Sequence, residues 1–120
     1  MTILSTALVA LVALFHAYVF VMESLLWQTP RVMKTFGTNP TTAATTKTLA
    51  ANQGVYNLFL TAGLIWSLIA ANPLAVELKI FFLACVVVAA IAAGITASRR
   101  IMLVQGTPAL IALILVLLSR

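Results

Sequence analysis

Four long apolar stretches, separated by short polar connections, dominate the chain. They cover about residues 3–26, 48–71, 74–97 and 101–118. A helix needs roughly 20 mainly apolar residues to cross the hydrocarbon core of a bilayer, and each stretch is near that length. The pattern therefore predicts an all-α polytopic membrane protein, with four transmembrane helices in an antiparallel bundle and a single domain over residues 1–120.

The connections contain the residues that typically begin and end helices. Asn39-Pro40 and Asn72-Pro73 each place a cap residue directly before a proline, which is typical of a first helical turn. The second helix is therefore expected to begin near residue 48 or, with a polar extension, near Pro40. Ser98-Arg99-Arg100 is expected to end the third helix with charge. No Lys or Arg precedes the first stretch and no small-residue cleavage pattern follows it, so we interpret it as a retained transmembrane helix.

The composition supports a membrane protein over the water-soluble classes. Hydrophobic residues make up 63% of the chain and charged residues 8%, whereas soluble globular proteins are about 45–50% apolar. The formal net charge of +5 does not indicate nucleic-acid binding, because the basic residues are dispersed and are not interleaved with exposed aromatic residues. Membrane lipid is thus the expected partner, and no nucleic acid is expected.

The basic residues predict an orientation in the membrane. Those of the first and third connections are Arg31, Lys34, Lys47, Arg99 and Arg100. The other side carries only Lys79, offset by Glu77, and the terminal Arg120. Since cytoplasmic loops are enriched in Lys and Arg, the first and third connections are expected in the cytoplasm and both termini outside.

Polar side chains inside the apolar stretches are the candidates for function, because they are costly in a bilayer. His16 and Glu23 are seven residues apart, which places both on one face of an α-helix. Four polar residues of the second helix fall within an arc of roughly 140° and match them in depth at about 1.5 Å per residue. The predicted site, in the cytoplasmic half of the bundle, consists of His16, Glu23, Asn52, Gln53, Tyr56, Asn57 and Gln105.

Three functions fit this cluster. It can bind a small molecule or ion, as in a transporter. It can be the centre of a membrane-embedded enzyme on a lipid-soluble substrate, with His16 and Tyr56 as the candidate catalytic acid–base pair. It can also be a structural network in an accessory subunit. No metal or cofactor is expected, because His16 and Glu23 lie about 10 Å apart along the helix axis and no metal-binding or nucleotide-binding motif is present.

Two further features concern packing. Cys85 is the only cysteine, which excludes an intrachain disulfide, and it is expected to be a small packing residue. Ala89, Ala93 and Ala97 recur at four-residue spacing and would let two helices approach closely. This seam is interpreted either as a homo-oligomer contact or as a contact inside one four-helix unit.

Several segments resemble one known family. They are Phe36-Gly37-Thr38-Asn39-Pro40, the string Asn52-Gln53-Gly54-Val55-Tyr56-Asn57, Gln105-Gly106-Thr107-Pro108-Ala109, and His16 with the spacing of Glu23 and Trp27. Together they resemble the DUF1304 family of small bacterial membrane proteins over essentially the whole chain. The resemblance implies four transmembrane helices in a bacterial cytoplasmic membrane. It implies no established activity and transfers no catalytic role to any residue.

Overall fold

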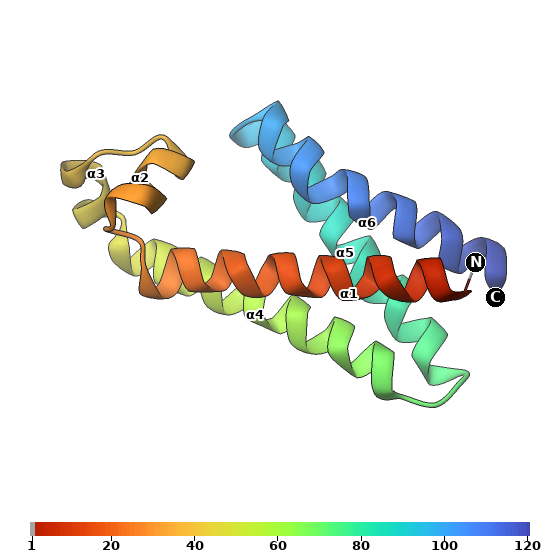
Figure 1. Cartoon of the computed structure of the whole chain (residues 1–120). Helices are drawn as coiled ribbons and strands as arrows, with labels where there is room; N and C mark the ends of the chain where they lie inside the picture. Colours follow the sequence, from red (N-terminus) through yellow and green to blue (C-terminus); the bar gives the residue numbers. More distant parts are fainter. Residues whose placement is uncertain (1) are drawn as a thin grey trace. The chain divides into compact units, whose positions relative to one another are not determined.

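The computed structural model describes residues 2–120, and this part of the chain is helical without strands (Figure 1). The elements are α1 (Thr2–Phe20), the π-helix η1 (Val21–Leu25), α2 (Pro30–Phe36), α3 (Pro40–Thr45), α4 (Lys47–Ile69), α5 (Leu74–Thr96) and α6 (Arg99–Ser119). The all-α prediction is confirmed.

Three segments are long and apolar enough to cross a membrane: Ile3–Leu25, Leu74–Thr96 and Arg99–Ser119. They support a membrane-spanning protein. Helix α4 has 23 residues, as many as α5, but Asn52, Gln53 and Asn57 make its first half polar. By composition α4 is therefore not a candidate span, and the bundle of four transmembrane helices stays a prediction.

The chain forms two compact units. The first combines the chain up to Leu14 with Leu60–Arg120, and the second is Phe15–Phe59. Both α1 and α4 therefore contribute to each unit. Six of the seven predicted site residues belong to the second unit, and Gln105 belongs to the first.

The core of the first unit is built from small and branched apolar side chains of four helices. Its buried members are Val9, Val12 and Ala13 of α1, Leu64 of α4, Leu83 and Val86 of α5, and Ala109, Ala112 and Val116 of α6. Many large apolar residues point outward instead; Ile3 is 88% exposed and Ile95 80% exposed. Soluble proteins rarely expose so much contiguous apolar surface, and lipid is the environment that suits it.

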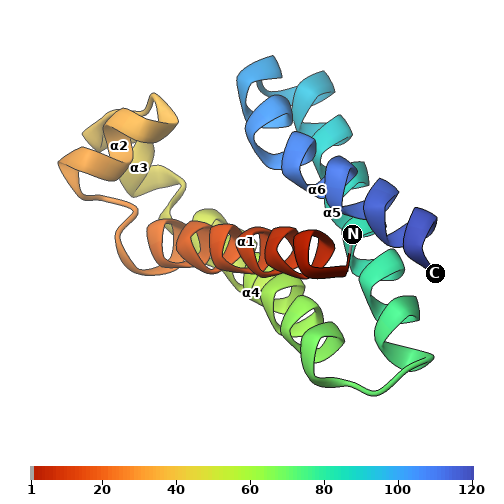
Figure 2. The same ribbon diagram turned by 45° about the vertical axis from the view of Figure 1, so that its right-hand side comes forward.

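Helices α5 and α6 form a hairpin within the first unit (Figures 1 and 2). Two glycines permit the close approach: a Cβ at Gly106 would lie 2.8 Å from the Cβ of Ala90, and a Cβ at Gly94 would clash with Met102. Ala90 and Gly94 thus contact α6 of the same unit. The predicted seam of Ala89, Ala93 and Ala97 is not part of these two contacts, so both of its interpretations, a contact inside one unit and a homo-oligomer, stay predictions.

Two cap predictions are wrong. Pro73, not Asn72, is the N-cap of α5, so the helix begins at Leu74. Arg99 and Arg100 do not end α5, although the Ser98 N–H donates to the carbonyl oxygen of Ala93 in the last turn of α5 at 2.9 Å. Ser98 also begins the next helix. Its side-chain oxygen accepts a hydrogen bond from the Arg100 N–H at 3.1 Å, which makes Ser98 the N-cap of α6. Arg99 and Arg100 therefore open α6, because serine satisfies free N–H groups at a helix start.

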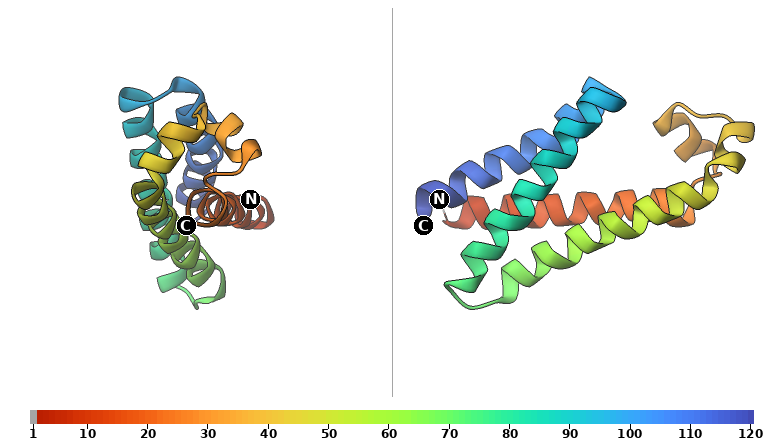
Figure 3. Two further views of the ribbon diagram at one scale, coloured as in Figure 1. Left: turned by 90° about the vertical axis from the view of Figure 1, so that its left-hand side faces the viewer. Right: turned by 180° about the vertical axis from the view of Figure 1, so that it is seen from behind.

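The short helices α2 and α3 connect η1 to α4 in the second unit (Figure 3). Asn39 caps α3 by accepting from the Thr42 N–H at 2.9 Å, and Pro40 follows as the first helical residue, as predicted. Helix α2 ends at Gly37, whose φ of 67° favours glycine. A break at Thr46 separates α3 from α4. Helix α4 therefore begins at Lys47, close to the predicted start near residue 48, and the alternative extension from Pro40 is a separate short helix.

Candidate functional site

The end of the first span is a π-helix. The Leu26 N–H donates to the carbonyl oxygen of Val21, five residues earlier, at 3.0 Å. The first predicted helix, about residues 3–26, thus keeps its extent but ends in a π-helix that was not predicted. Single π turns inside α-helices are rare and occur frequently at functional sites.

Glu23 and Asn57 form the polar centre of this region. The Nδ2 atom of Asn57 donates to Oε1 of Glu23 at 2.8 Å and to the backbone oxygen of Gln53 at 3.1 Å. Because both neighbours are acceptors, the amide must point its nitrogen toward them and its oxygen away. Glu23 is only 7% exposed, and Asn57 is half-buried. The structure thus brings together these two residues of the predicted site.

The Glu23 carboxyl group has no cationic partner in the described part of the chain, where Asn57 is its one hydrogen-bond partner. Its second oxygen, Oε2, accepts no hydrogen bond from any of residues 2–120. Among residues 2–120, the only buried side-chain oxygen or nitrogen without a partner that is fully enclosed belongs to Thr38. Oε2 of Glu23 therefore reaches the molecular surface, and the same holds for Oδ1 of Asn57.

A close helix contact positions this pair. The Ser24 hydroxyl of η1 donates to the backbone oxygen of Ala51 at 2.9 Å. A Cβ at Gly54 would clash with that hydroxyl and would lie 3.1 Å from the Ser24 nitrogen. Gly54 thus lets α4 approach η1 closely. Sequence reasoning assigned neither residue to the site, although a glycine inside a helical pattern often has a packing role.

Trp27 contacts the short helical segments of the second unit through a hydrogen bond and a ring contact. Its Nε1 donates to Oγ1 of Thr46 at 3.2 Å, and its ring lies 5.1 Å from that of Phe36. These contacts link Trp27, two residues after the end of η1, to α2 and to the break between α3 and α4. Trp27 is half-buried, so its contacts within the protein account for it as well as a position at the membrane interface does.

The other predicted site residues lie in different environments. His16 is completely buried and packs edge-on against Phe15, with ring centroids 5.2 Å apart. Tyr56 is 66% exposed and packs against Phe59. Asn52 and Gln53 are exposed and Gln105 is half-buried. A shared site that includes these residues with Glu23 and Asn57 stays a prediction.

The oxygen atoms available here do not resemble a metal centre. In residues 2–120, no three His, Cys, Asp or Glu side chains come together. Glu23 supplies one carboxyl group, and amide and carbonyl oxygens supply the rest. A hydrogen-bonding ligand suits this arrangement better than an ion that needs six or more oxygens.

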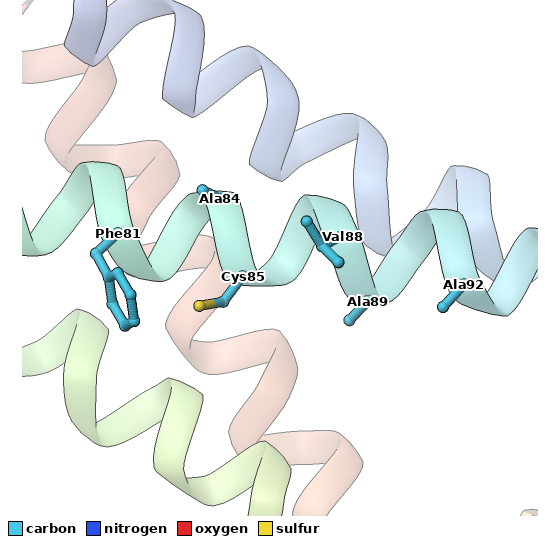
Figure 4. A pocket seen from close by; sticks show the side chains of 6 residues that line it. All are labelled: Phe81, Ala84, Cys85, Val88, Ala89 and Ala92. Carbon is cyan, nitrogen blue, oxygen red and sulfur yellow. The ribbon is translucent and has the colours of Figure 1, made fainter.

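A separate hollow lies on the first unit, along one helix (Figure 4). The side chains that line it are Phe81, Ala84, Cys85, Val88, Ala89 and Ala92, all on α5. The surface is apolar apart from the Cys85 thiol, which is half-buried and free. It offers no carboxyl, amide or hydroxyl side chain, so the Glu23–Asn57 pair remains the candidate site.

Comparisons with known proteins give a consistent result. The profile of a family described as "Protein of unknown function (DUF1304)" matches residues 10–117. A relative described as "Uncharacterized protein YpaA", from Lactococcus lactis subsp. lactis (strain IL1403), is 30% identical over 116 residues, covering 95% of this chain and 97% of the relative. No solved structure gives a significant match. The extent of the family match shows that the chain belongs to the DUF1304 family.

Proposed function

We propose that this protein is a four-span membrane protein of the cytoplasmic membrane whose Glu23–Asn57 pair is the centre of a binding site for a small molecule or ion. One observation carries the proposal. A carboxyl group that is 7% exposed lies in a π-helix of an apolar span, bonded to one amide and to no basic side chain. Ionisable residues in membrane spans mark ligand and ion pathways by default.

Stability alone is a weak reason for such a pair. Polar interactions between membrane helices contribute about 0.6 kcal/mol on average. A regular α-helical turn with apolar side chains would hold the same two helices together without the π-helix. Binding gives a reason for both the pair and the open acceptor atoms beside it.

The proposal includes α4 as the fourth span. Its first half carries the polar residues, and Asn57 directs its amide to Glu23. Its second half, Leu60–Ile69, is apolar apart from Thr61 and Ser67, and both hydroxyls bond to backbone oxygens. Polar residues are tolerated in a span when they face protein rather than lipid. The low hydropathy of α4 would then reflect the site itself.

Binding, with transport as one form of it, is favoured over catalysis. The proposed enzyme pair, His16 and Tyr56, combines a fully buried side chain with one that is 66% exposed. No contact in the described residues aligns a proton donor with an acceptor at Tyr56. An accessory role remains the outcome if the pair proves to be structural only.

A carboxyl-directed reagent tests the binding site. Dicyclohexylcarbodiimide is apolar and adds to carboxyl groups within membranes. In purified protein in lipid nanodiscs, we expect it to label Glu23, because Oε2 reaches the surface. Mass spectrometry of peptides gives the site of the adduct.

The matched controls are Glu23→Gln, which should remove the adduct, and Glu77→Gln, which should not. Glu77 is the exposed acidic residue of α5. Labelling confined to Glu77 or the C-terminal carboxyl group would contradict the proposed site.

A further inference from the structure

We infer that the ligand of the Glu23–Asn57 site is a small organic cation with N–H donors, such as a primary ammonium group. The inference rests on the proposed function and adds the chemical class of the ligand. It follows from the hydrogen-bonding capacity that the pair leaves unused.

Both unused atoms are acceptors. The Nδ2 atom of Asn57 donates to Oε1 of Glu23 at 2.8 Å and to the backbone oxygen of Gln53 at 3.1 Å. What remains is Oε2 of Glu23 and Oδ1 of Asn57, neither with a donor in the described part of the chain. A ligand with acceptors only would face two acceptors, which is repulsive. A ligand with two N–H groups can satisfy both atoms.

The charges around Glu23 also favour a cationic ligand. No Lys or Arg forms an ion pair with Glu23 within residues 2–120. Between Glu23 and Glu77 the chain has no other acidic residue, so Glu23 is the one acidic group of the second unit. Hydrogen bonds to an ionised partner are roughly twice as strong as neutral ones. A cation therefore gains most from this site.

Bare metal ions and quaternary cations fit less well. Ions such as Ca²⁺ take six to eight oxygens, and the described site offers two open side-chain acceptors. Quaternary ammonium groups carry the charge but no N–H, so they leave both acceptors without donors. The exposed side chains of Asn52 and Gln53, about one turn before Asn57, add polar surface on the same helix.

Four probes of similar size test the inference: phenethylammonium, its trimethylated analogue, phenethyl alcohol and phenylpropionate. Binding to the protein in lipid nanodiscs is measured by isothermal titration calorimetry. We expect phenethylammonium to bind at least about tenfold more tightly than each of the others, because one hydrogen bond to a charged group accounts for about that ratio. Glu23→Gln should abolish the preference and Glu77→Gln should preserve it.

The outcomes separate the two proposals. If the alcohol or the carboxylate bound most tightly, and Glu23→Gln abolished that preference, the inference of a cationic ligand would be overturned. The proposal of a binding site at Glu23 would remain. Equal binding of all probes, or none, would also overturn the inference of a cationic ligand. If carbodiimide in addition fails to reach Glu23, the proposed function falls too. Should Glu23→Gln not fold, protection of wild-type Glu23 from carbodiimide by phenethylammonium, and not by the alcohol, gives the same decision.

Discussion

Replacing Asn57 with leucine is expected to lower the free energy of unfolding by about 2–3 kcal/mol, because it leaves the buried Glu23 carboxyl group without its donor. The loss exceeds the net contribution of the pair. Removing one partner exposes the full desolvation cost of the other, whereas removing both does not. Unfolding in detergent micelles, followed by circular dichroism, measures the change.

The double variant Glu23→Leu/Asn57→Leu should recover most of this loss, since no unsatisfied polar group remains. Asn52→Leu is the matched control, because Asn52 is on the same helix but exposed, and its effect should stay within about 0.5 kcal/mol. A double variant as unstable as Asn57→Leu would mean that the pair is needed for folding. That result would support a structural role.

Cysteine labelling is expected to give an all-or-none pattern across the chain. In a Cys85→Ala background, Lys34→Cys and Arg99→Cys should resist an impermeant maleimide in intact cells, and Asn72→Cys should react. The reason is the excess of Lys and Arg in the first and third connections, which favours the cytoplasm for both. All three positions are exposed, so each should react after the cells are permeabilised.

The same pattern separates four spans from three. Position 34 precedes α4 and position 72 follows it. If α4 does not cross the membrane, both positions lie on the same side and label alike, while position 99 differs. Reactive Lys34→Cys and Arg99→Cys with a protected Asn72→Cys would instead reverse the orientation.

The long elements could be predicted from the sequence because they depend on local properties. Apolar stretches of bilayer length predicted the three apolar spans to within two residues at each end, and Asn39-Pro40 predicted the start of α3. The start of α6 was missed by two residues, because the Ser98 side chain caps α6, which places Arg99 and Arg100 in that helix. Side-chain direction at a cap depends on backbone geometry that composition does not determine.

The candidate site could be predicted only in part. Polar residues in apolar stretches indicated Glu23 and Asn57, which the structure joins. The π-helix could not be predicted, because Val21–Leu25 contains no residue that requires it. Its contacts with α4 through Ser24 and Asn57 are tertiary. The exposure of Tyr56 was also missed, since depth along a helix does not tell which neighbours cover a side chain.

The central claim is that the Glu23–Asn57 pair is a ligand site and more than a contact between helices. The most direct test is a structure from crystals grown in a lipid phase that contains phenethylammonium. We predict non-protein density within hydrogen-bonding distance, about 3.2 Å or less, of both Oε2 of Glu23 and Oδ1 of Asn57. If side chains of the protein itself satisfied both oxygens and no such density were present, the pair would be a closed structural network, and the claim would be contradicted.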